Sequence, residues 1–70
     1  MIYNVAYKDK NGEDFNGLPW LEGLFDTRTQ MEAAVKNLKD LGCQDITPFK
    51  IENKYPESIT WEYVEQNKIQ

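Results

Sequence analysis

Residue types that commonly carry out catalysis are scarce in this sequence. None of the 70 residues is a histidine, so Ser-His-Asp and Cys-His arrangements cannot form within one chain. Ser58 follows a Tyr-Pro-Glu run typical of a turn and lacks the Ser-x-x-Lys spacing of a serine–lysine pair. Cys43 comes just after a predicted helix, whose negative dipole end disfavours a reactive thiolate. We therefore interpret Ser58 as a turn residue and Cys43 as a small buried hydrophobic residue.

The carboxylates do not build a recognisable acid–base or metal site. Glu62 and Glu65 are a candidate pair for acid–base chemistry, but a strand through them would point the two side chains to opposite faces. The run from Asp9 to Asp14 carries oxygen ligands at alternate positions without the glycine and glutamate spacing of a calcium loop. One thiol and no imidazole leave too few ligands for zinc. The sequence therefore predicts no enzymatic activity, no metal and no cofactor.

The charge of the chain disfavours nucleic acid and suits a protein partner. The 12 acidic residues outnumber the 8 basic ones, for a net charge of −4, whereas nucleic-acid backbones favour clustered lysine and arginine. The aromatic run Trp61-Glu62-Tyr63 lacks neighbouring bases, which single-stranded nucleic acid would need. A partner protein with a basic surface fits this acidity better.

The length and the apolar pattern predict a small soluble protein. No apolar run approaches the roughly 20 residues that a membrane-spanning helix needs, and the first residues lack the apolar centre of a signal peptide. The one cysteine excludes a disulfide within the chain. We therefore expect a cytoplasmic protein without membrane contact, folded as a single compact domain over residues 1–70.

The first part of the chain predicts two strands joined by irregular chain. Residues 2–7 alternate large apolar side chains at every second position, which is typical of a strand. Asn11-Gly12 is a strong turn signal. A second Asn-Gly and a proline follow, so we expect irregular structure up to Trp20. Residues 21–25 then predict a short strand with a bulge at Gly23.

A helix over residues 28–41 is the clearest element. Thr27 can cap its first turn, and Gln30 completes a capping-box pattern. Gly42 follows at the position where a left-handed residue commonly ends a helix. One apolar stripe runs along the helix and is predicted to face the core; it consists of Met31, Ala34, Val35, Leu38 and Leu41.

The last part of the chain predicts two more strands. Residues 45–52 alternate apolar and polar side chains, and Pro48 predicts that this strand lies at an edge of the sheet or carries a bulge. A turn is expected over residues 53–58. Residues 59–65 alternate as a strand would, with Trp61 and Tyr63 on one side and Glu62 on the other. A helix that starts with Pro56 is the alternative for this segment.

These elements together predict an α+β fold. The order strand, strand, helix, strand, strand favours a two-layer sandwich, in which one helix packs on an antiparallel sheet of three to four strands. The predicted core combines the helix stripe with one face of the final strand and with Val5, Phe25, Phe49 and Ile51.

The aromatic residues suggest the function. A core with one helix cannot easily bury nine large rings, and tryptophan and tyrosine are enriched where proteins bind each other. We therefore predict a non-catalytic protein-binding module, an inhibitor or adaptor. It would occupy a basic, nucleic-acid-handling surface of a partner, as anti-defence inhibitors encoded by mobile elements do. The predicted binding residues are Trp20, Tyr55, Glu57, Trp61, Glu62, Tyr63 and Glu65.

Two other classes of function are compatible with the sequence. One is a structural protein that assembles as a homodimer through a sheet edge or an aromatic surface. The other is a subunit whose catalytic site is completed by another chain.

Overall fold

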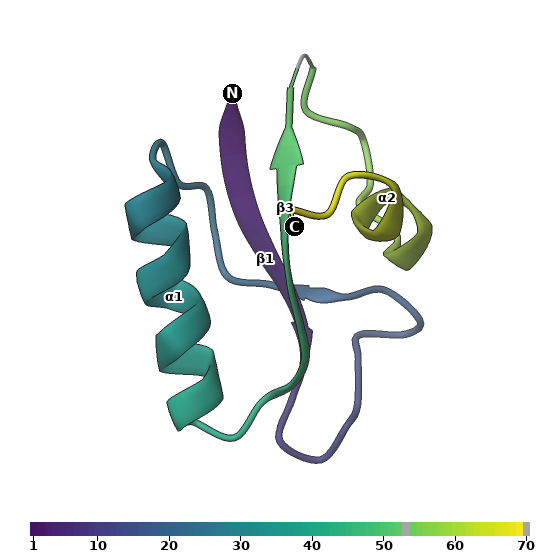
Figure 1. Ribbon diagram of the computed structural model, residues 1–70. Coiled ribbons are helices and arrows are strands. Elements are labelled where there is room, and N and C mark those ends of the chain that lie inside the picture. The colour runs from purple at the N-terminus through teal and green to yellow at the C-terminus, as the bar shows by residue number, and fades with distance from the viewer. Residues whose placement is uncertain (53, 70) are drawn as a thin grey trace.

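The fold is built on a sheet that has a helix on each side. The computed structural model describes residues 1–52 and 54–69. Along these residues the chain forms β1 (Ile2–Lys8), β2 (Trp20–Leu21), α1 (Arg28–Asp40), β3 (Gln44–Ile51) and α2 (Trp61–Gln66) (Figure 1). Neither described helix is long and apolar enough to cross a membrane.

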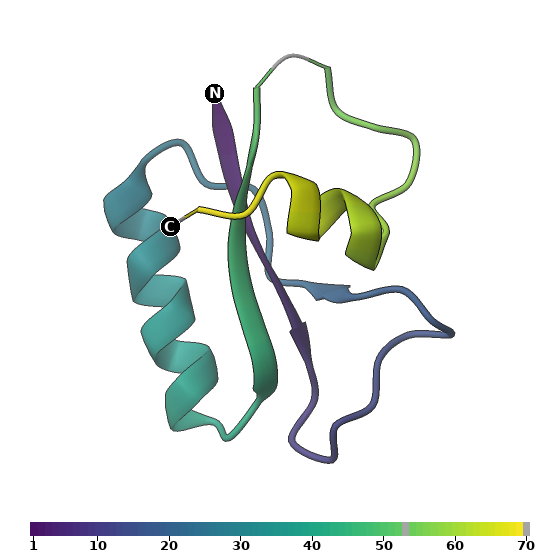
Figure 2. The same cartoon turned by 45° about the vertical axis from the view of Figure 1, so that its right-hand side comes forward.

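Strand β1 is the centre of the sheet. The strand order is β2-β1-β3, and both neighbours pair with β1 in antiparallel direction. Successive side chains of β1 therefore enter two different clusters, Val5 that of α1 and Ala6 that of α2. Figures 1 and 2 show α1 and α2 on opposite sides of the strands. The predicted α+β class with an antiparallel sheet is confirmed, whereas the arrangement of layers is helix, sheet, helix.

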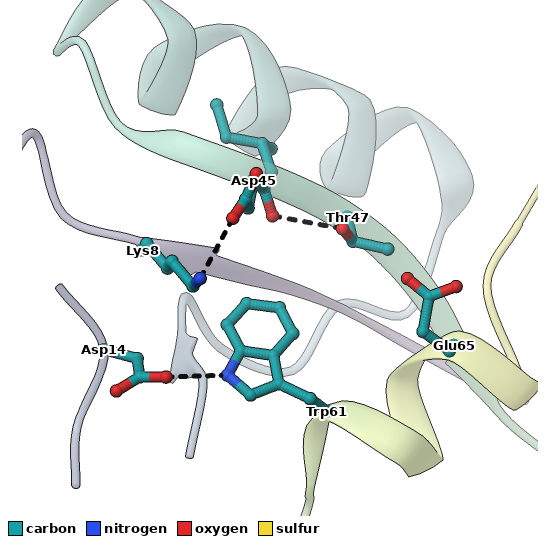
Figure 3. A pocket seen from close by; sticks show the side chains of 7 residues that line it. Lys8, Asp14, Asp45, Thr47, Trp61 and Glu65 are labelled. Atoms are coloured by element: carbon teal, nitrogen blue, oxygen red, sulfur yellow. Dashed lines mark hydrogen bonds and ion pairs between the residues drawn. The ribbon is translucent and has the colours of Figure 1, made fainter. Parts of the chain in front are cut away.

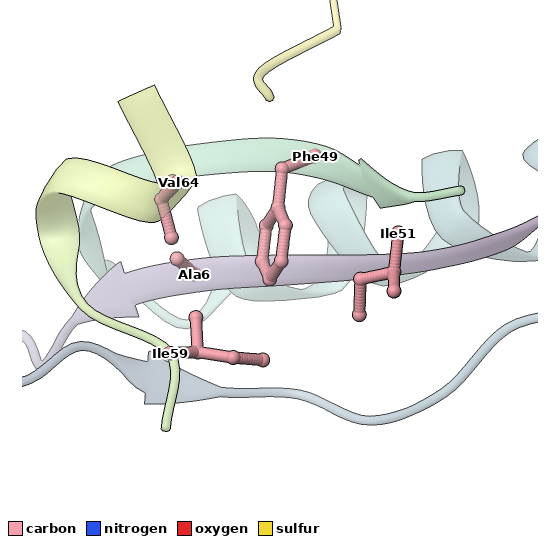
Figure 4. Packing of buried hydrophobic residues seen from close by; sticks show 5 residues of the cluster. All are labelled: Ala6, Phe49, Ile51, Ile59 and Val64. Atoms are coloured by element: carbon pink, nitrogen blue, oxygen red, sulfur yellow. The ribbon is translucent and has the colours of Figure 1, made fainter. Parts of the chain in front are cut away.

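The core is consequently divided between the two faces of the sheet. Val5 and the half-buried Phe25 pack with α1. Phe49 and Ile51 are fully or almost fully buried on the α2 side, as Figure 4 shows. The prediction of one core that combines all four residues was wrong, because a sheet with both faces covered separates its odd and even positions.

Helix α1 begins where the sequence predicts. The Thr27 hydroxyl accepts a hydrogen bond from the Gln30 backbone N–H at 3.2 Å. The Gln30 side chain accepts in turn from the backbone N–H of Asp26 at 3.1 Å, one residue earlier than in the usual capping box. Both bonds satisfy N–H groups that the start of the helix would otherwise leave unpaired.

The end of α1 also follows the prediction. The N–H of Gly42 donates to the Lys39 carbonyl and the N–H of Cys43 to the Leu38 carbonyl, both at 3.0 Å. These two bonds form a Schellman motif, in which a contact between the flanking apolar side chains is common. Cys43 is half-buried in the same cluster as Leu38, so the structure supports a packing role for this thiol.

The buried apolar stripe of α1 ends at Leu38, three positions before the predicted Leu41. Met31, Ala34 and Leu38 are buried and Val35 is partly buried against them. Leu41 is 69% exposed, because it is the C-cap residue, where the chain leaves the helix axis. Its predicted place in the core was wrong.

Leu38 and Leu41 allow a matched test of this packing. Leu38→Ala removes a side chain that is only 2% exposed, so we expect the free energy of unfolding to fall by about 2–5 kcal/mol. Leu41→Ala should change it by less than about 0.5 kcal/mol. Urea unfolding followed by circular dichroism measures both values, and equal losses would contradict the assigned core.

The final segment is a helix and not the predicted strand. The Thr60 hydroxyl accepts from the Tyr63 backbone N–H at 3.1 Å and caps α2. Ile59 and Val64, on either side of this cap, pack in one cluster (Figure 4), which is the hydrophobic staple of a helix start. The helix begins at Trp61 and not at Pro56. The prediction that Trp61 and Tyr63 share one strand face opposite Glu62 was therefore wrong.

Pro48 lies on an edge strand, as predicted, and the chain end pairs with the outer side of this strand at positions 48 and 50. The Lys50 N–H donates to the Asn67 carbonyl at 3.1 Å, and the Ile69 N–H donates to the Pro48 carbonyl at 3.0 Å. Positions 48 and 50 therefore point their backbone groups away from β1, so the missing N–H of Pro48 costs no bond to β1. Of the turn predicted over residues 53–58, residue 53 lies outside the described residues.

A buried asparagine joins β1 to the chain that follows β2. Asn4 is 1% exposed, and its side-chain oxygen accepts from the Val5 N–H at 2.8 Å and the Gly23 N–H at 3.1 Å. Gly23 has φ +149°, which glycine adopts readily. Pairing resumes at Phe25, which exchanges two 2.9 Å backbone bonds with Tyr3. The predicted bulge at Gly23 is thus present, although β2 itself is limited to two residues.

Replacement of Asn4 tests the importance of this link. Asn4→Ala leaves two backbone N–H groups without their acceptor, so we expect a loss of about 1–3 kcal/mol of folding free energy. Asn37→Ala, on the exposed side of α1, is the control and should be nearly neutral. Thermal unfolding of both variants gives the comparison, and an unaffected Asn4→Ala protein would refute the role of the amide.

Candidate functional site

Residues 9–19 form a loop that projects from the sheet on the side away from α1 (Figures 1 and 2). The Asp9 carboxylate organises the start of this loop. One of its oxygens accepts from the N–H groups of Asn11 at 2.9 Å and Glu13 at 3.0 Å, which explains why the predicted Asn11-Gly12 turn forms here.

The second Asn-Gly pair makes a tight hairpin within the same loop. Asn16 and Gly17 have φ values of +52° and +86°, the left-handed pair that a two-residue hairpin turn requires. Phe15 and Leu18 exchange backbone hydrogen bonds of 2.8 Å and 2.9 Å across this turn. The segment that the sequence predicts as irregular is therefore an ordered turn.

This turn displays a group of exposed apolar side chains, here called the loop patch: Phe15, Leu18 and Trp20. They are 51%, 36% and 39% exposed. The rings of Phe15 and Trp20 lie 5.1 Å apart between centroids. Pro19 is buried and Leu21 packs on the core, so the alternation along the chain turns Leu18 and Trp20 outward. Exposed aromatic groups of this kind commonly mark a binding surface.

The excess negative charge of the protein lies in the same part of the chain. Residues 11–27 contain four acidic residues and no basic one, whereas the remaining sequence has eight of each. Glu13 and Glu22 flank the loop patch in sequence, and neither carboxylate forms an ion pair among the described residues. Tyr7 is the residue that pairs with Trp20 in the sheet. Burial raises the pKa of the Tyr7 hydroxyl, and the negative charge of Glu22 raises it further.

A second group of polar side chains lies beneath the loop (Figure 3). The Trp61 indole N–H donates to one oxygen of Asp14 at 3.0 Å, and the Gly17 N–H donates to the other at 3.1 Å. The Lys8 ammonium lies 5.6 Å from the Trp61 ring centre and 3.2 Å from a carboxylate oxygen of Asp45. The indole hydrogen bond, followed by that of Gly17, lowers the pKa of Asp14.

This polar group borders a hollow of about 400 Å³. Figure 3 shows the ion pair of Lys8 with Asp45 and the hydrogen bond from Trp61 to Asp14. Glu65 pairs with Lys68, so each charged side chain that lines the hollow already has a partner. Among the described residues, no three His, Cys, Asp or Glu side chains gather closely enough to hold a metal ion. The residues that line the hollow are Lys8, Asp14, Asp45, Ile46, Thr47, Trp61 and Glu65.

The structure does not bring the seven predicted binding residues together. Trp20 belongs to the loop patch, whereas Trp61 is half-buried beside Asp14. Tyr63 packs edge-on against Phe49, with 6.2 Å between ring centres.

The other predicted binding residues are exposed elsewhere. Glu62 accepts a hydrogen bond from Gln66 at 3.3 Å, and Glu65 forms an ion pair of 3.2 Å with Lys68. Tyr55 and Glu57 are exposed in the chain before α2. Their part in binding stays a prediction.

Phe15 and Leu18 are the candidates that the sequence interpretation missed. Two signals in the sequence point to them. The repeated Asn-Gly predicts a hairpin turn that would hold both side chains at its base, and a charge count over residues 11–27 reveals the local excess that the whole-chain value conceals.

Comparisons with protein-family models, with curated proteins and with solved structures gave no match to this chain.

The lowered pKa of Asp14 gives a prediction on pH. A carboxyl group whose pKa is lower in the folded than in the unfolded protein stabilises the fold above the ordinary value of about 3.9, and this stabilisation is lost as the pH falls through the folded value. We expect Asp14→Asn to be less stable than wild type at pH 6 and the difference to shrink towards pH 2.5. Urea unfolding at several pH values measures it.

Glu13→Gln is the control for this experiment, because the Glu13 side chain has no partner within the described part of the chain. It removes the same charge from the neighbouring residue. A stability difference for Asp14→Asn that does not change with pH would contradict the assigned hydrogen bonds.

Proposed function

We propose that this chain is a non-catalytic protein-binding module that docks through the loop patch. The observation that carries the proposal is the coincidence of two features in residues 11–27. This segment holds the exposed side chains of Phe15, Leu18 and Trp20, and it contributes the net charge of the whole protein.

The chemistry of this surface defines the partner. The apolar side chains supply the contact area and the anchoring rings, and the carboxylates of Glu13 and Glu22 favour lysine or arginine around it. The partner is therefore a protein with an apolar pocket bordered by basic side chains. A nucleic-acid-handling protein has such basic surfaces, and occupation of that surface would make the chain an inhibitor.

Self-association through the same surface is less favourable. A symmetric contact places equivalent patches against each other, so Glu13 and Glu22 of one copy would face the like charges of the other. Such juxtapositions cost free energy unless a cation intervenes. The homodimer therefore stays the alternative, and sedimentation at several concentrations distinguishes it from binding to another protein.

A cytoplasmic location is part of the proposal. It is supported by the single cysteine, which is half-buried and packs as an apolar side chain.

A variant pair tests the proposed surface. Phe15→Ser combined with Trp20→Ser removes both rings of the patch, and Leu41→Ser is the control because it also removes an exposed apolar side chain, at the far end of α1. All three proteins, wild type included, are used for affinity capture from the native host. The captured partner is then titrated by calorimetry.

We expect the control to bind as wild type does and the double variant to bind at least about 30-fold more weakly, as hot-spot aromatic residues do. Glu13→Gln and Glu22→Gln should slow association, with an effect that diminishes as salt is added. Equal capture by wild type and the double variant would overturn the proposal.

A further inference from the structure

We propose that Trp61 is a positioning residue for the loop patch: through Asp14 it holds the turn of residues 15–18 in its docking shape before a partner arrives. This inference rests on the proposed function for its biological meaning, but the geometry that supports it is independent of any partner.

The turn needs such support because it lies in a long connection. Residues 9–19 join β1 to β2, and the loop patch is largely exposed. Fixing the backbone of exposed residues costs conformational entropy, and a loop that is already ordered does not incur this cost again on binding.

Asp14 supplies the support by using both carboxylate oxygens. One oxygen accepts from the Gly17 N–H, inside the turn, at 3.1 Å. The other accepts from the Trp61 indole N–H, on α2, at 3.0 Å. A single side chain thus connects the turn to a helix that lies 47 residues away along the chain, from Asp14 to Trp61.

Trp61 is itself fixed by the fold. It is the first residue of α2, and the Lys8 ammonium lies 5.6 Å from its ring centre. Val64, one turn further along α2, is fully buried against Phe49 and Ile59 (Figure 4). The link therefore runs from the core through α2 to the indole, and from there through the carboxylate to the turn.

The position of the indole explains why it supports the patch and does not form part of it. Trp61 lines the hollow beneath the loop together with Asp14 and Glu65 (Figure 3), whereas the rings of Phe15 and Trp20, which are tilted by 51° to each other, are exposed. Trp61 therefore acts on a partner through the order of the turn.

Trp61→Phe tests the link because it keeps a ring and removes the N–H donor. The first readout is amide hydrogen exchange by NMR at Gly17 and Leu18, whose N–H groups bond within the turn. We expect exchange there to rise about tenfold, as for the loss of a hydrogen bond to a charged group, while Val5 in β1 is unchanged. The variant retains Trp20 as its only tryptophan, so a fall in fluorescence anisotropy reports greater motion of the patch.

Asp14→Ala gives the same test without changing the side of α2 that packs on the core. It should raise exchange at the same amides, and the double variant should add little, because the two residues belong to one link. Glu13→Ala is the matched control, since it removes a neighbouring carboxylate that has no partner in the described structure. Unchanged exchange in Trp61→Phe would overturn the inference, even if Asp14→Ala, which removes the acceptor of the Gly17 N–H itself, raises it.

Binding of the captured partner separates the inference from the proposed function. We expect Trp61→Phe to bind about tenfold more weakly with the same dependence on salt as wild type, and Glu13→Ala to alter the salt dependence instead. Weaker binding without faster exchange would make Trp61 a contact residue and refute positioning. Normal binding by the Phe15→Ser, Trp20→Ser double variant would refute the proposed function. The exchange experiment would still decide whether Trp61 orders the turn.

Discussion

The side-chain carbonyl of Asn4 accepts the N–H groups of Val5 and Gly23, which the bulge beside β1 would otherwise leave unpaired. Because β1 lies in the middle of the sheet, its register determines the register of everything around it. Between the Tyr7–Trp20 pair and the Tyr3–Phe25 pair, the segment that contains β2 has one more residue than β1. A buried amide that occupies this position permits the extra residue without loss of hydrogen bonding.

The consequence reaches the proposed binding surface. A shift of one residue turns each side chain of a strand to the other face, so the register next to the bulge determines that Leu21 enters the core. Trp20 is then turned away from it. The buried amide of Asn4 thus helps to determine that Trp20 is exposed on the proposed binding surface.

The parts of the fold that could be predicted from sequence are those that several independent signals indicate, such as a long apolar periodicity together with helix caps. Helix α1 has several turns of apolar periodicity and a cap at each end, so that its bounds differ from the prediction by one residue. Pro48 indicated an edge strand because a residue without a backbone N–H is rarely found in a central strand. Such signals agree with one another, and the tertiary structure did not have to override any of them.

The short C-terminal segment could not be predicted in this way. Over residues 59–65, a strand and a single helical turn would place many of the same apolar residues on one side, so the pattern does not distinguish them. The helix forms because Thr60 caps it and because Ile59 packs with Val64. The burial of Leu41 was predicted wrongly for a related reason. The apolar periodicity of the sequence continues to Leu41, whereas the helix ends one residue before it. Phe15 and Leu18 could not be predicted from the same signals, because the net charge of the whole chain conceals the acidic segment and because Asn16-Gly17 beside a proline also indicates irregular structure.

The residues that close the outer side of β3 bear on how copies of this protein can meet. Growth of a fibre by strand addition requires each copy to present two free edges, one to receive a strand and one to offer. Here Asn67 and Ile69 already pair with Lys50 and Pro48, so the outward backbone groups of β3 are occupied at these two positions, and the opposite edge strand, β2, has only two residues. A strand of another copy can therefore pair with β3 over residues 48–50 only if the chain end is first displaced.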